Sequence, residues 1–393
     1  MRILLLSFYY EPDLSAGSFR ATALVDALSQ NMVEELTIDV LTTMPNRYKT
    51  FSVETPEVEI HGGISVHRIP LPAHESGMLD QSRSFLIYSV RVLSFVASKD
   101  YDVVVATSSR LMTAVLAAWI SRRKKIPLYL DIRDIFVDTI NEVFPRYLSA
   151  TVGPLFRIME RYAVSSATKV NLVSAGFEQY FSERYREMEF TFFTNGIDDE
   201  FVAASGVDAR HSAHKGAPYR ALYAGNIGEG QGLHAILPEL ARRMSGRVCF
   251  RVIGDGGRKI VLQSKLSQQG IDNVEILAPM NREQLITEYR DADVLFLHLN
   301  DHAAFTKVLP SKLFEYAAMG KPIWAGVAGY AADFVRSEIS NAVVFNPCNS
   351  EDAERSFEDL KLEDSSRGEF VKKYERKNIM LKMAAGILNL TSE

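Results

Sequence analysis

Short, mainly apolar runs alternate with amphipathic segments along the first half of the chain. The runs are typical of strands that are buried on both faces of a sheet. Between them, apolar residues recur at the spacing of one helix face. Strands that alternate with helices are typical of a doubly wound parallel sheet, so this half predicts an α/β domain. The runs that predict strands are Arg2–Phe8, Leu36–Leu41, Ser65–Ile69, Val103–Thr107, Leu128–Asp131 and Lys169–Val173. The segments that predict helices are Phe19–Leu28, Ser84–Ala97, Leu111–Arg122 and Leu155–Ser165.

The alternation starts again in the second half. A strand at Tyr219–Tyr223, a glycine-rich loop at Ala224–Gly232 and a helix at Leu233–Ala241 repeat the opening of the first half. The polar stretch from Asn195 to Pro218 therefore predicts a boundary between two Rossmann-like domains. This stretch contains the turn-forming pairs Asn195-Gly196, Ser205-Gly206 and Lys215-Gly216. Further strands are predicted at Val248–Ile253, Val274–Leu277, Val294–Leu297, Ile323–Ala325 and Ala342–Phe345.

We place the boundary after Gly196, so that residues 1–196 form one domain and residues 197–373 a second. Each is long enough to bury a core of its own. Because open α/β sheets bind ligands at the carboxyl ends of their strands, a cleft between the two sheets is the expected site.

The composition excludes several classes of function. The chain has 393 residues and a net charge of −5, and neither half is basic, so we expect no nucleic-acid partner. Two cysteines, Cys249 and Cys348, argue against a disulfide framework or a thiolate metal site. The longest clean apolar run, Leu111–Ile120, is far short of the roughly 20 residues that span a bilayer. The amino-terminal run is too short for a signal peptide, so we expect a cytoplasmic protein.

The segment from Val308 to Pro322 is the most informative motif. Pro310 suits the first turn of a helix, where its missing N–H costs nothing. The free N–H groups of that turn, with Lys307 and Lys312 beside them, predict a site for a diphosphate. Glu315 lies about one turn further and can accept hydrogen bonds from ribose hydroxyls. The alternative is an amphipathic helix on which Glu315 is simply solvated.

Glycine-rich loops follow three of the predicted strands. Gly225–Gly232 joins a strand to a helix, where the backbone can approach a phosphate closely, but no Gly-Lys-Ser/Thr follows as in a Walker loop. Gly254–Gly257 follows the next strand and either lines the same nucleotide pocket or forms a plain tight turn. In the first half, Ser15–Ser18 takes the corresponding place after the first strand.

Carboxylates follow or precede two further strands. Asp131-Ile-Arg133-Asp134 ends a strand, and a carboxylate there can orient or deprotonate an acceptor hydroxyl. The alternative is an internal Asp–Arg ion pair that shapes the loop. Asp291-Ala-Asp293 resembles a metal-binding pair but precedes a strand, so we read it as a helix end. The histidines show no paired metal spacing, and we expect no metal.

The segment around Glu315 resembles the donor-binding motif of the family 4 retaining glycosyltransferases, which have the GT-B fold. Other segments match that family in order, and together they cover nearly the whole chain. Within the family, the chain is most similar to the branch that includes N-acetyl-L-fucosamine transferases of bacterial O-antigen and capsule synthesis. The matching segments are Tyr9–Arg20, Asp131–Asp134, Val173–Phe177, Thr194–Asp198, Ala224–Gly232 and Ile253–Gly256.

The resemblance implies two Rossmann-like domains that face each other across a cleft, with a helix in residues 374–393 that packs back on the N-terminal domain. It implies a retaining hexosyltransferase that takes a sugar, such as an N-acetylated amino- or deoxy-sugar, from a UDP-sugar. The acceptor would be a polyprenyl-diphosphate-linked saccharide held by the N-terminal domain. The second domain would hold the nucleotide-sugar, and no cofactor is expected beyond this substrate.

The motifs and the resemblance together assign candidate residues to three roles. The catalytic candidates are Asp131, Asp134 and Lys307. The donor-binding candidates are Gly17, Gly225, Asn226, Gln231, Gly254, Asp255, Pro310, Ser311, Lys312, Leu313 and Glu315. The acceptor-binding candidates are Ser18, Arg20 and Arg133.

Three positions depart from the family pattern. Lys307 stands where the family usually has a Glu that contacts the donor sugar. Asn226 and Gln231 stand where Arg and Lys usually bind the diphosphate. We hypothesise that positive charge has moved from this loop to Lys307. The departures leave two alternatives open, a GT-B nucleotide-sugar epimerase and a catalytically inactive GT-B scaffold module.

Two apolar helices lie next to basic residues. Leu111–Ile120 is followed by Ser-Arg-Arg-Lys-Lys125, and Ser84–Ala97 carries Arg91 and follows Arg83. A basic cluster beside an apolar helix can dock on anionic lipid. The alternative is a buried core helix with a charged carboxyl end. The lipid-linked acceptor implied by the resemblance favours the inner face of the cytoplasmic membrane.

Overall fold

The computed structural model describes residues 1–30, 36–46, 54–72, 78–108, 110–135, 137, 146–205 and 218–391. Two of the turn-forming pairs named above, at 205–206 and 215–216, therefore lie wholly or partly outside the described residues. The chain divides into two compact units. Unit 1 holds Met1–Thr194 together with Lys377–Glu393, and unit 2 holds Asn195–Arg376. The breaks at Thr194 and Arg376 lie close to the boundaries predicted at 196 and 373.

Unit 1 is built on an eight-stranded sheet in the order β3-β4-β2-β1-β5-β6-β7-β8. All neighbouring strands are parallel except β3, which runs antiparallel to β4 at one edge. The strands are β1 (Arg2–Leu6), β2 (Thr37–Thr43), β3 (Val58–His61), β4 (Ile64–Ile69), β5 (Val103–Ser108), β6 (Leu128–Ile132), β7 (Lys169–Leu172) and β8 (Phe190–Thr191). Side chains of β1 and β5 are buried on both faces, as the continuous apolar runs predict.

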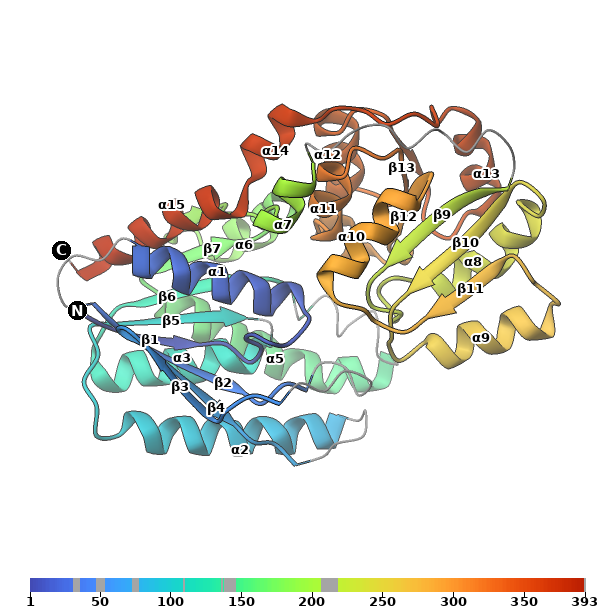
Figure 1. Cartoon of the computed structure of the whole chain (residues 1–393). Coiled ribbons are helices and arrows are strands. Elements are labelled where there is room, and N and C mark those ends of the chain that lie inside the picture. Colours follow the sequence, from blue (N-terminus) through green and yellow to red (C-terminus); the bar gives the residue numbers. More distant parts are fainter. Residues whose placement is uncertain are drawn as a thin grey trace. The chain divides into compact units, whose positions relative to one another are not determined.

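Helices cover both faces of this sheet. Figure 1 shows α2 and α3 on one side and α1 and α15 on the other. The helices of unit 1 are α1 (Ala16–Gln30), α2 (Met78–Val96), α3 (Leu111–Lys124), α5 (Arg146–Ser166), α6 (Glu178–Arg184) and α15 (Arg376–Leu388), with short 3₁₀ turns at Ala175–Phe177 and Asn389–Thr391. Helix α15 buries Met380, Met383 and Ile387 in one cluster with Ile3 of β1 and Leu24 of α1. The carboxyl-terminal helix is therefore part of the core of unit 1.

Unit 2 is built on a six-stranded parallel sheet in the order β11-β10-β9-β12-β13-β14. The strands are β9 (Tyr219–Ala224), β10 (Val248–Ile253), β11 (Val274–Leu277), β12 (Val294–His298), β13 (Ile323–Gly326) and β14 (Ala342–Phe345). The helices are α7 (Asp199–Ala204), α8 (Leu233–Arg243), α9 (Lys259–Gln268), α10 (Arg282–Asp291), α11 (Lys312–Ala318), α12 (Tyr330–Glu338), α13 (Ser350–Glu358) and α14 (Gly368–Tyr374), with a 3₁₀ turn at Ala303–Lys307. Two separate apolar clusters hold the helices to the sheet.

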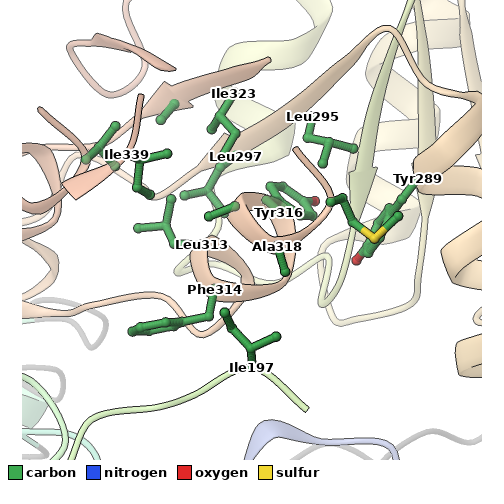
Figure 2. Close-up of a cluster of buried hydrophobic side chains, with 14 of the residues drawn as sticks. Ile197, Tyr289, Leu295, Leu297, Leu313, Phe314, Tyr316, Ala318, Ile323 and Ile339 are labelled. Atoms are coloured by element: carbon green, nitrogen blue, oxygen red, sulfur yellow. The ribbon is translucent and has the colours of Figure 1, made fainter. Parts of the chain in front are cut away.

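Helix α11 is fixed to the sheet by its apolar side chains. Leu313, Phe314 and Tyr316 are fully buried, and Figure 2 shows them among Leu297 of β12 and Ile197. Burying large side chains of this kind contributes roughly 1.5–3 kcal/mol each relative to exposure. The anchoring determines where the polar residues of α11 lie.

The two segments that connect the units run beside each other at Gly196. Ile197 N donates to Tyr374 O at 2.8 Å, and Arg376 N donates to Ile197 O at 2.9 Å. A Cβ at Gly196 would lie 2.6 Å from the Arg376 Cα, so only glycine allows this approach. The Asn195-Gly196 pair, which we predicted as a turn, therefore serves close packing of two backbone segments.

Candidate functional site

Two glycine-rich loops leave neighbouring strands of unit 2 at the same edge of the sheet. The loop at 225–232 follows β9, and the loop at 254–257 follows β10. On its other side β9 pairs with β12, which leads to α11. The connections from β9 run toward β10 and those from β12 run toward β13, so the strand order reverses between β9 and β12. Ligands of open α/β sheets bind at such a reversal point.

The two loops touch through their backbones. A Cβ at Gly254 would lie 1.9 Å from the carbonyl oxygen of Gly225, and a Cβ at Gly256 would lie 2.6 Å from that of Ile227. Ile227 N also donates to Asp255 O at 2.8 Å. No side chain fits between the loops, so glycine is required at Gly254 and Gly256 and the backbone itself forms this surface.

Asn226 and Gln231 brace the first loop from within. Asn226 Nδ2 donates to Gln231 Oε1 at 2.8 Å, and the Tyr223 hydroxyl donates to Asn226 O at 2.6 Å. We predicted both side chains as donor contacts. The structure gives these amide groups a contact with each other that holds the loop, and their contact with the donor stays a prediction.

The segment after β12 holds the same loop from the other side. Asn300 N donates to Gly230 O at 2.8 Å, and Asn300 Nδ2 donates to Glu229 O at 2.9 Å. His298 Nδ1 lies 2.7 Å from Gln231 O, and His298 Nε2 accepts from Cys348 N at 2.9 Å. A neutral imidazole with its proton on Nδ1 satisfies both contacts. Burial lowers the pKa of His298 to about 4.

We expect acid to destabilise unit 2 through His298. The unfolded chain takes up a proton near the ordinary pKa of 6.5, whereas the folded chain does so only near 4, so this group's contribution is complete above pH 6.5 and is lost as the pH falls toward 4. The loss amounts to at most about 3 kcal/mol. Urea unfolding of wild type and His298→Asn at pH 7 and pH 5 measures it. An equal pH dependence in both proteins would show that His298 does not carry the effect.

A buried polar cluster sits at the start of α11. Lys312 Nζ donates to Glu315 Oε2 at 2.8 Å and lies 3.3 Å from the Tyr289 hydroxyl. That hydroxyl donates to Glu315 Oε2 at 3.2 Å. Burial and the Glu315 carboxylate raise the pKa of Tyr289 well above its usual range. The Lys312 side chain is 26% exposed and passes Gly225, whose Cβ would lie 3.8 Å from Lys312 Cε. Lys312 thus places a cation where α11 meets the first glycine-rich loop.

The predicted helix start at Pro310 is two residues too early. Helix α11 begins at Lys312 and has seven residues. Leu313 N donates to Pro310 O and Phe314 N donates to Ser311 O, so Pro310 and Ser311 form a preceding 3₁₀-like turn. The helix therefore starts later than the diphosphate site that we predicted at Pro310 requires. Binding of a diphosphate here would depend more on the charge of Lys312.

The remaining candidates in unit 2 lie around this cluster. Lys307 ends the 3₁₀ turn that precedes α11 and is half-buried. Asp255 accepts a hydrogen bond from Gly256 N at 2.9 Å through its own Oδ1. The Leu313 side chain is fully buried in the apolar cluster, so a donor contact at this position would have to come from its backbone. The side chain anchors α11.

In unit 1 the predicted acceptor residue Arg20 forms a buried ion pair with the predicted catalytic residue Asp131. Arg20 Nε and Nη2 donate to the two Asp131 oxygens at 2.7 and 2.8 Å, and both side chains are 0% exposed. Burial alone would raise the pKa of Asp131, but Arg20 outweighs it and the pKa is lowered. The alternative that we kept was an ion pair within the 131–134 segment, whereas Asp131 pairs with Arg20 of α1. Both side chains are buried in this arrangement, and their proposed roles toward the substrates stay predictions.

The other predicted residues of unit 1 lie at two strand ends. Gly17 and Ser18 are buried in the first turn of α1. Arg133 is half-buried and its backbone N donates to Ser108 Oγ at 3.2 Å, while Asp134 is exposed. Arg133 and Asp134 follow the carboxyl end of β6, as predicted, and Arg133 lies close enough to Asp131 to help lower the pKa of its carboxyl.

Sequence reasoning missed one cation of unit 1, Arg110. It follows β5, which pairs with β1 where the strand order of this sheet reverses. Its guanidinium lies 3.9 Å from the centre of the Phe8 ring and donates to the Tyr9 hydroxyl at 3.1 Å. No carboxylate of the described residues pairs with it. The sequence signal that could have identified Arg110 was a charged residue two positions after the end of a buried strand.

The described parts of the chain hold no group of three or more His, Cys, Asp or Glu side chains arranged to bind an ion. Asp291 is the last residue of α10, which confirms that the Asp291-Ala-Asp293 segment is a helix end. Asp293 accepts a hydrogen bond from Arg220 N at 2.8 Å.

Each of the two units matches a known protein family. Residues 21–196 match the glycosyl transferase 4-like domain, and residues 207–377 match glycosyl transferases group 1. These matches identify the chain as a glycosyltransferase. The two α/β units confirm the predicted fold class, GT-B.

One curated relative matches part of the chain. WcaI of Escherichia coli K12, by its name a colanic acid biosynthesis glycosyl transferase, is 32% identical over 99 residues, which are 25% of this chain and 24% of WcaI. The match thus spans about a quarter of that relative. It does not single out the N-acetyl-L-fucosamine transferase branch.

Solved structures agree over nearly the full length. Sucrose-phosphate synthase from Thermosynechococcus elongatus has a TM-score of 0.72 at 13% identity, covering 100% of this chain and 99% of that one. WaaG, a glycosyltransferase involved in lipopolysaccharide biosynthesis, has a TM-score of 0.70 at 14% identity, covering 98% and 99%. HepE of Anabaena, solved with UDP-glucose, has a TM-score of 0.66 at 16% identity, covering 99% of each chain. At these identities the likeness to the solved structures shows the fold alone.

Proposed function

We propose that the protein is a retaining glycosyltransferase that moves a sugar from a UDP-sugar to a polyprenyl-diphosphate-linked saccharide in bacterial surface polysaccharide synthesis. The observation that carries the proposal is the arrangement at the β9/β12 reversal point of unit 2. Two touching glycine backbones, a cation and a buried carboxylate converge there, which is the chemistry that a nucleoside diphosphate requires.

Each part of the donor finds a matching group at this point. The glycine-rich backbone at Gly225 and Gly254 allows a diphosphate to approach closely, and Lys312 supplies the charge. A lysine–phosphate pair at ~4 Å gains about 4 kcal/mol at an effective dielectric of 20. Glu315 is held by Lys312 and Tyr289 and accepts hydrogen bonds from the ribose hydroxyls. The UDP-glucose bound by HepE, a protein of the same fold, supports a uridine nucleotide.

In the proposed reaction, the main task of the protein is to stabilise the charge on the departing diphosphate. The bond between the anomeric carbon and the β-phosphate oxygen breaks, and the acceptor oxygen bonds to the same face of the sugar. The acceptor proton passes to an oxygen of the departing diphosphate. Lys312, with Lys307 on the preceding turn, stabilises the negative charge that develops on that group, and such stabilisation is commonly the largest catalytic contribution.

The acceptor side is proposed to use unit 1. A polyprenyl-diphosphate acceptor carries negative charge, and Arg110 presents a guanidinium at the β1/β5 reversal point of the first sheet. The Phe8 ring and the Tyr9 hydroxyl hold this guanidinium in place. Arg110 therefore fits a contact to the acceptor phosphate better than the buried Arg20.

Arg110→Ala is expected to raise the KM for the acceptor about tenfold or more, as loss of one charge-assisted hydrogen bond predicts. The KM for the donor should stay within about twofold of wild type. Initial rates at varied acceptor and varied donor concentrations separate the two. A matched rise in both constants, or none, would contradict an acceptor role.

The donor proposal is tested by the thermal stability of the wild-type protein with a panel of nucleotides and nucleotide-sugars. A ligand at 100 times its Kd adds about 2.7 kcal/mol and shifts the unfolding midpoint measurably. We expect UDP and at least one UDP-sugar to stabilise the protein. Stabilisation by no nucleotide would favour an inactive scaffold module. UDP release from a UDP-sugar without any acceptor would favour an epimerase.

A further inference from the structure

Helices α3 and α5 of unit 1 pack side by side and expose apolar side chains on their outer surfaces. On α3, Trp119 is 47% exposed. On α5, Leu155 is 50% and Ile158 is 67% exposed. Met112 and Val115 of α3 and Met159 and Tyr162 of α5 are half-buried. Exposed large apolar residues that gather on neighbouring elements mark a contact surface more often than isolated ones do.

The spacing shows that the exposed residues of α3 form one stripe. Met112, Val115, Trp119 and Arg122 follow one another by three or four positions, so they line a single face of the helix. Arg122 lies over the Tyr162 ring of α5 at 5.1 Å. This contact joins the two helices into one surface. We call the residues Met112, Val115, Trp119, Leu155, Ile158, Met159 and Tyr162 the α3/α5 face.

Within the described parts of α3 and α5, the exposed charged side chains are all cationic. Helix α3 contains no Asp or Glu, and the single acid of α5, Glu160, is 4% exposed. Glu160 accepts hydrogen bonds from the Tyr180 and Tyr185 hydroxyls at 3.1 and 3.0 Å, so its charge is turned inward. The exposed cations beside the face are Arg122, Arg123, Lys125, Arg157 and Arg161.

This cationic surface contrasts with the chain as a whole, whose net charge is −5. An ordinary solvated surface of an acidic protein mixes both signs of charge. An apolar stripe with an exposed tryptophan, on helices whose described exposed charges are arginine and lysine, is instead the pattern of helices that lie in a membrane interface. None of the helices that the structure describes is long and apolar enough to cross a bilayer.

We propose that the α3/α5 face docks unit 1 on a bilayer that contains anionic lipid. Trp119, Leu155 and Ile158 enter the interfacial region, and the arginines bind headgroup phosphates. The α3/α5 face would bring the protein to the membrane that holds the lipid-linked acceptor. In this respect the inference rests on the proposed function.

Helix α2 also exposes apolar side chains. It packs against α3 on the same side of the sheet (Figure 1) and exposes Leu86 and Val90, which are four positions apart on one face. Arg83 and Arg91 are exposed beside them. The sequence had left open whether the apolar segments at 84–97 and 111–120 are core helices or membrane contacts. The structure shows that each helix buries one side and exposes an apolar stripe on the other.

The test uses the full-length protein and vesicles of phosphatidylethanolamine with about 30 mol % phosphatidylglycerol, an anionic fraction that attracts basic surfaces. The chain has two tryptophans, and Trp324 is 0% exposed, so a change in emission on binding reports on Trp119. We expect co-sedimentation with these vesicles and a blue shift of the emission. Neutral phosphatidylcholine vesicles and high salt should reduce both, because salt screens the arginines.

Two variants and one matched control make the test specific. Arg157→Gln/Arg161→Gln should lower the partition coefficient at least about tenfold, and Ile158→Ser should lower it without changing the salt dependence. The control Ile260→Ser removes an apolar residue of unit 2 that is 80% exposed, and it should leave binding unchanged. The thermal shift with UDP, measured on every variant, reports folding and donor binding independently of lipid.

Three outcomes would overturn the proposal. These are failure to bind anionic vesicles, equal binding to phosphatidylcholine vesicles, and equal losses in Ile158→Ser and Ile260→Ser. Binding to vesicles without any UDP-induced stabilisation would support the α3/α5 face while contradicting the proposed donor chemistry.

Discussion

Lys312→Met is expected to abolish the stabilisation of the protein by UDP and to lower the rate of sugar transfer by about 10²–10³-fold, the usual cost of losing one group that stabilises developing charge. Lys312 reaches past Gly225 from the start of α11 and places a cation beside the first glycine-rich loop, whereas Lys259 Nζ donates to Gly254 O of the second loop at 3.4 Å. The diphosphate that it stabilises gains charge as the sugar leaves. Thermal shift with UDP and initial rates at saturating acceptor measure the two effects.

A second variant separates donor binding from a structural defect. Lys312→Met leaves Glu315 without its lysine, although Tyr289 still donates to the carboxylate. Lys312→Met/Glu315→Gln removes both charges, so we expect it to recover stability but not UDP binding. Lys361→Met, at an exposed lysine of unit 2, serves as the matched control. Near-normal UDP binding by the double variant would show that the site does not depend on this pair.

Arg20→Met is expected to destabilise unit 1 by about 3–5 kcal/mol, because it leaves the Asp131 carboxylate buried without its cation. Both side chains are fully buried, and Asn171 Nδ2 adds one hydrogen bond to Asp131 at 2.8 Å. Arg20 also donates to the carbonyl oxygens of Phe193 and Thr194 at 2.7 Å each. The pair therefore ties α1 and β6 to the last residues of the unit before the chain leaves it.

Urea unfolding monitored by circular dichroism measures this loss, with Arg186→Met, at an exposed arginine of unit 1, as the control. Arg20→Met/Asp131→Asn should recover part of the loss, since no unpaired charge stays buried. A direct catalytic role would show a different pattern, in which Asp131→Asn unfolds like wild type but loses transfer activity. That result would restore Asp131 to the catalytic assignment.

The sequence predicted those parts of the fold that depend on burial from both sides. Strands such as β1 and β5 read as apolar runs because every residue on them except Arg2 is buried. Strand β3 escaped detection, since it lies at the sheet edge with Val58 and Ile60 exposed, and β8 has only two residues. Helix α5 was predicted only from Leu155, whereas the helix begins at Arg146 and runs through Pro154.

The candidate site was predictable where its residues lie close together in the sequence. The glycine-rich loops and Lys312 with Glu315 were found from local motifs. The Arg20–Asp131 pair was not, because its members are 111 positions apart and meet only through the sheet. The direction of the Asn226 and Gln231 amides depends on the closed loop, and the place of Arg110 depends on the packing of β5 beside β1.

Acceptor-dependent sugar transfer tests the central proposal most directly. The wild-type protein is incubated with each member of a panel of UDP-sugars, with and without a membrane extract that contains lipid-linked saccharides. Mass spectrometry of the lipid fraction is read together with UDP release. We expect one added sugar on a lipid-linked saccharide and one UDP released for each transfer, with both lost in Lys312→Met. Equal UDP release with and without the extract, and no added sugar, would contradict it.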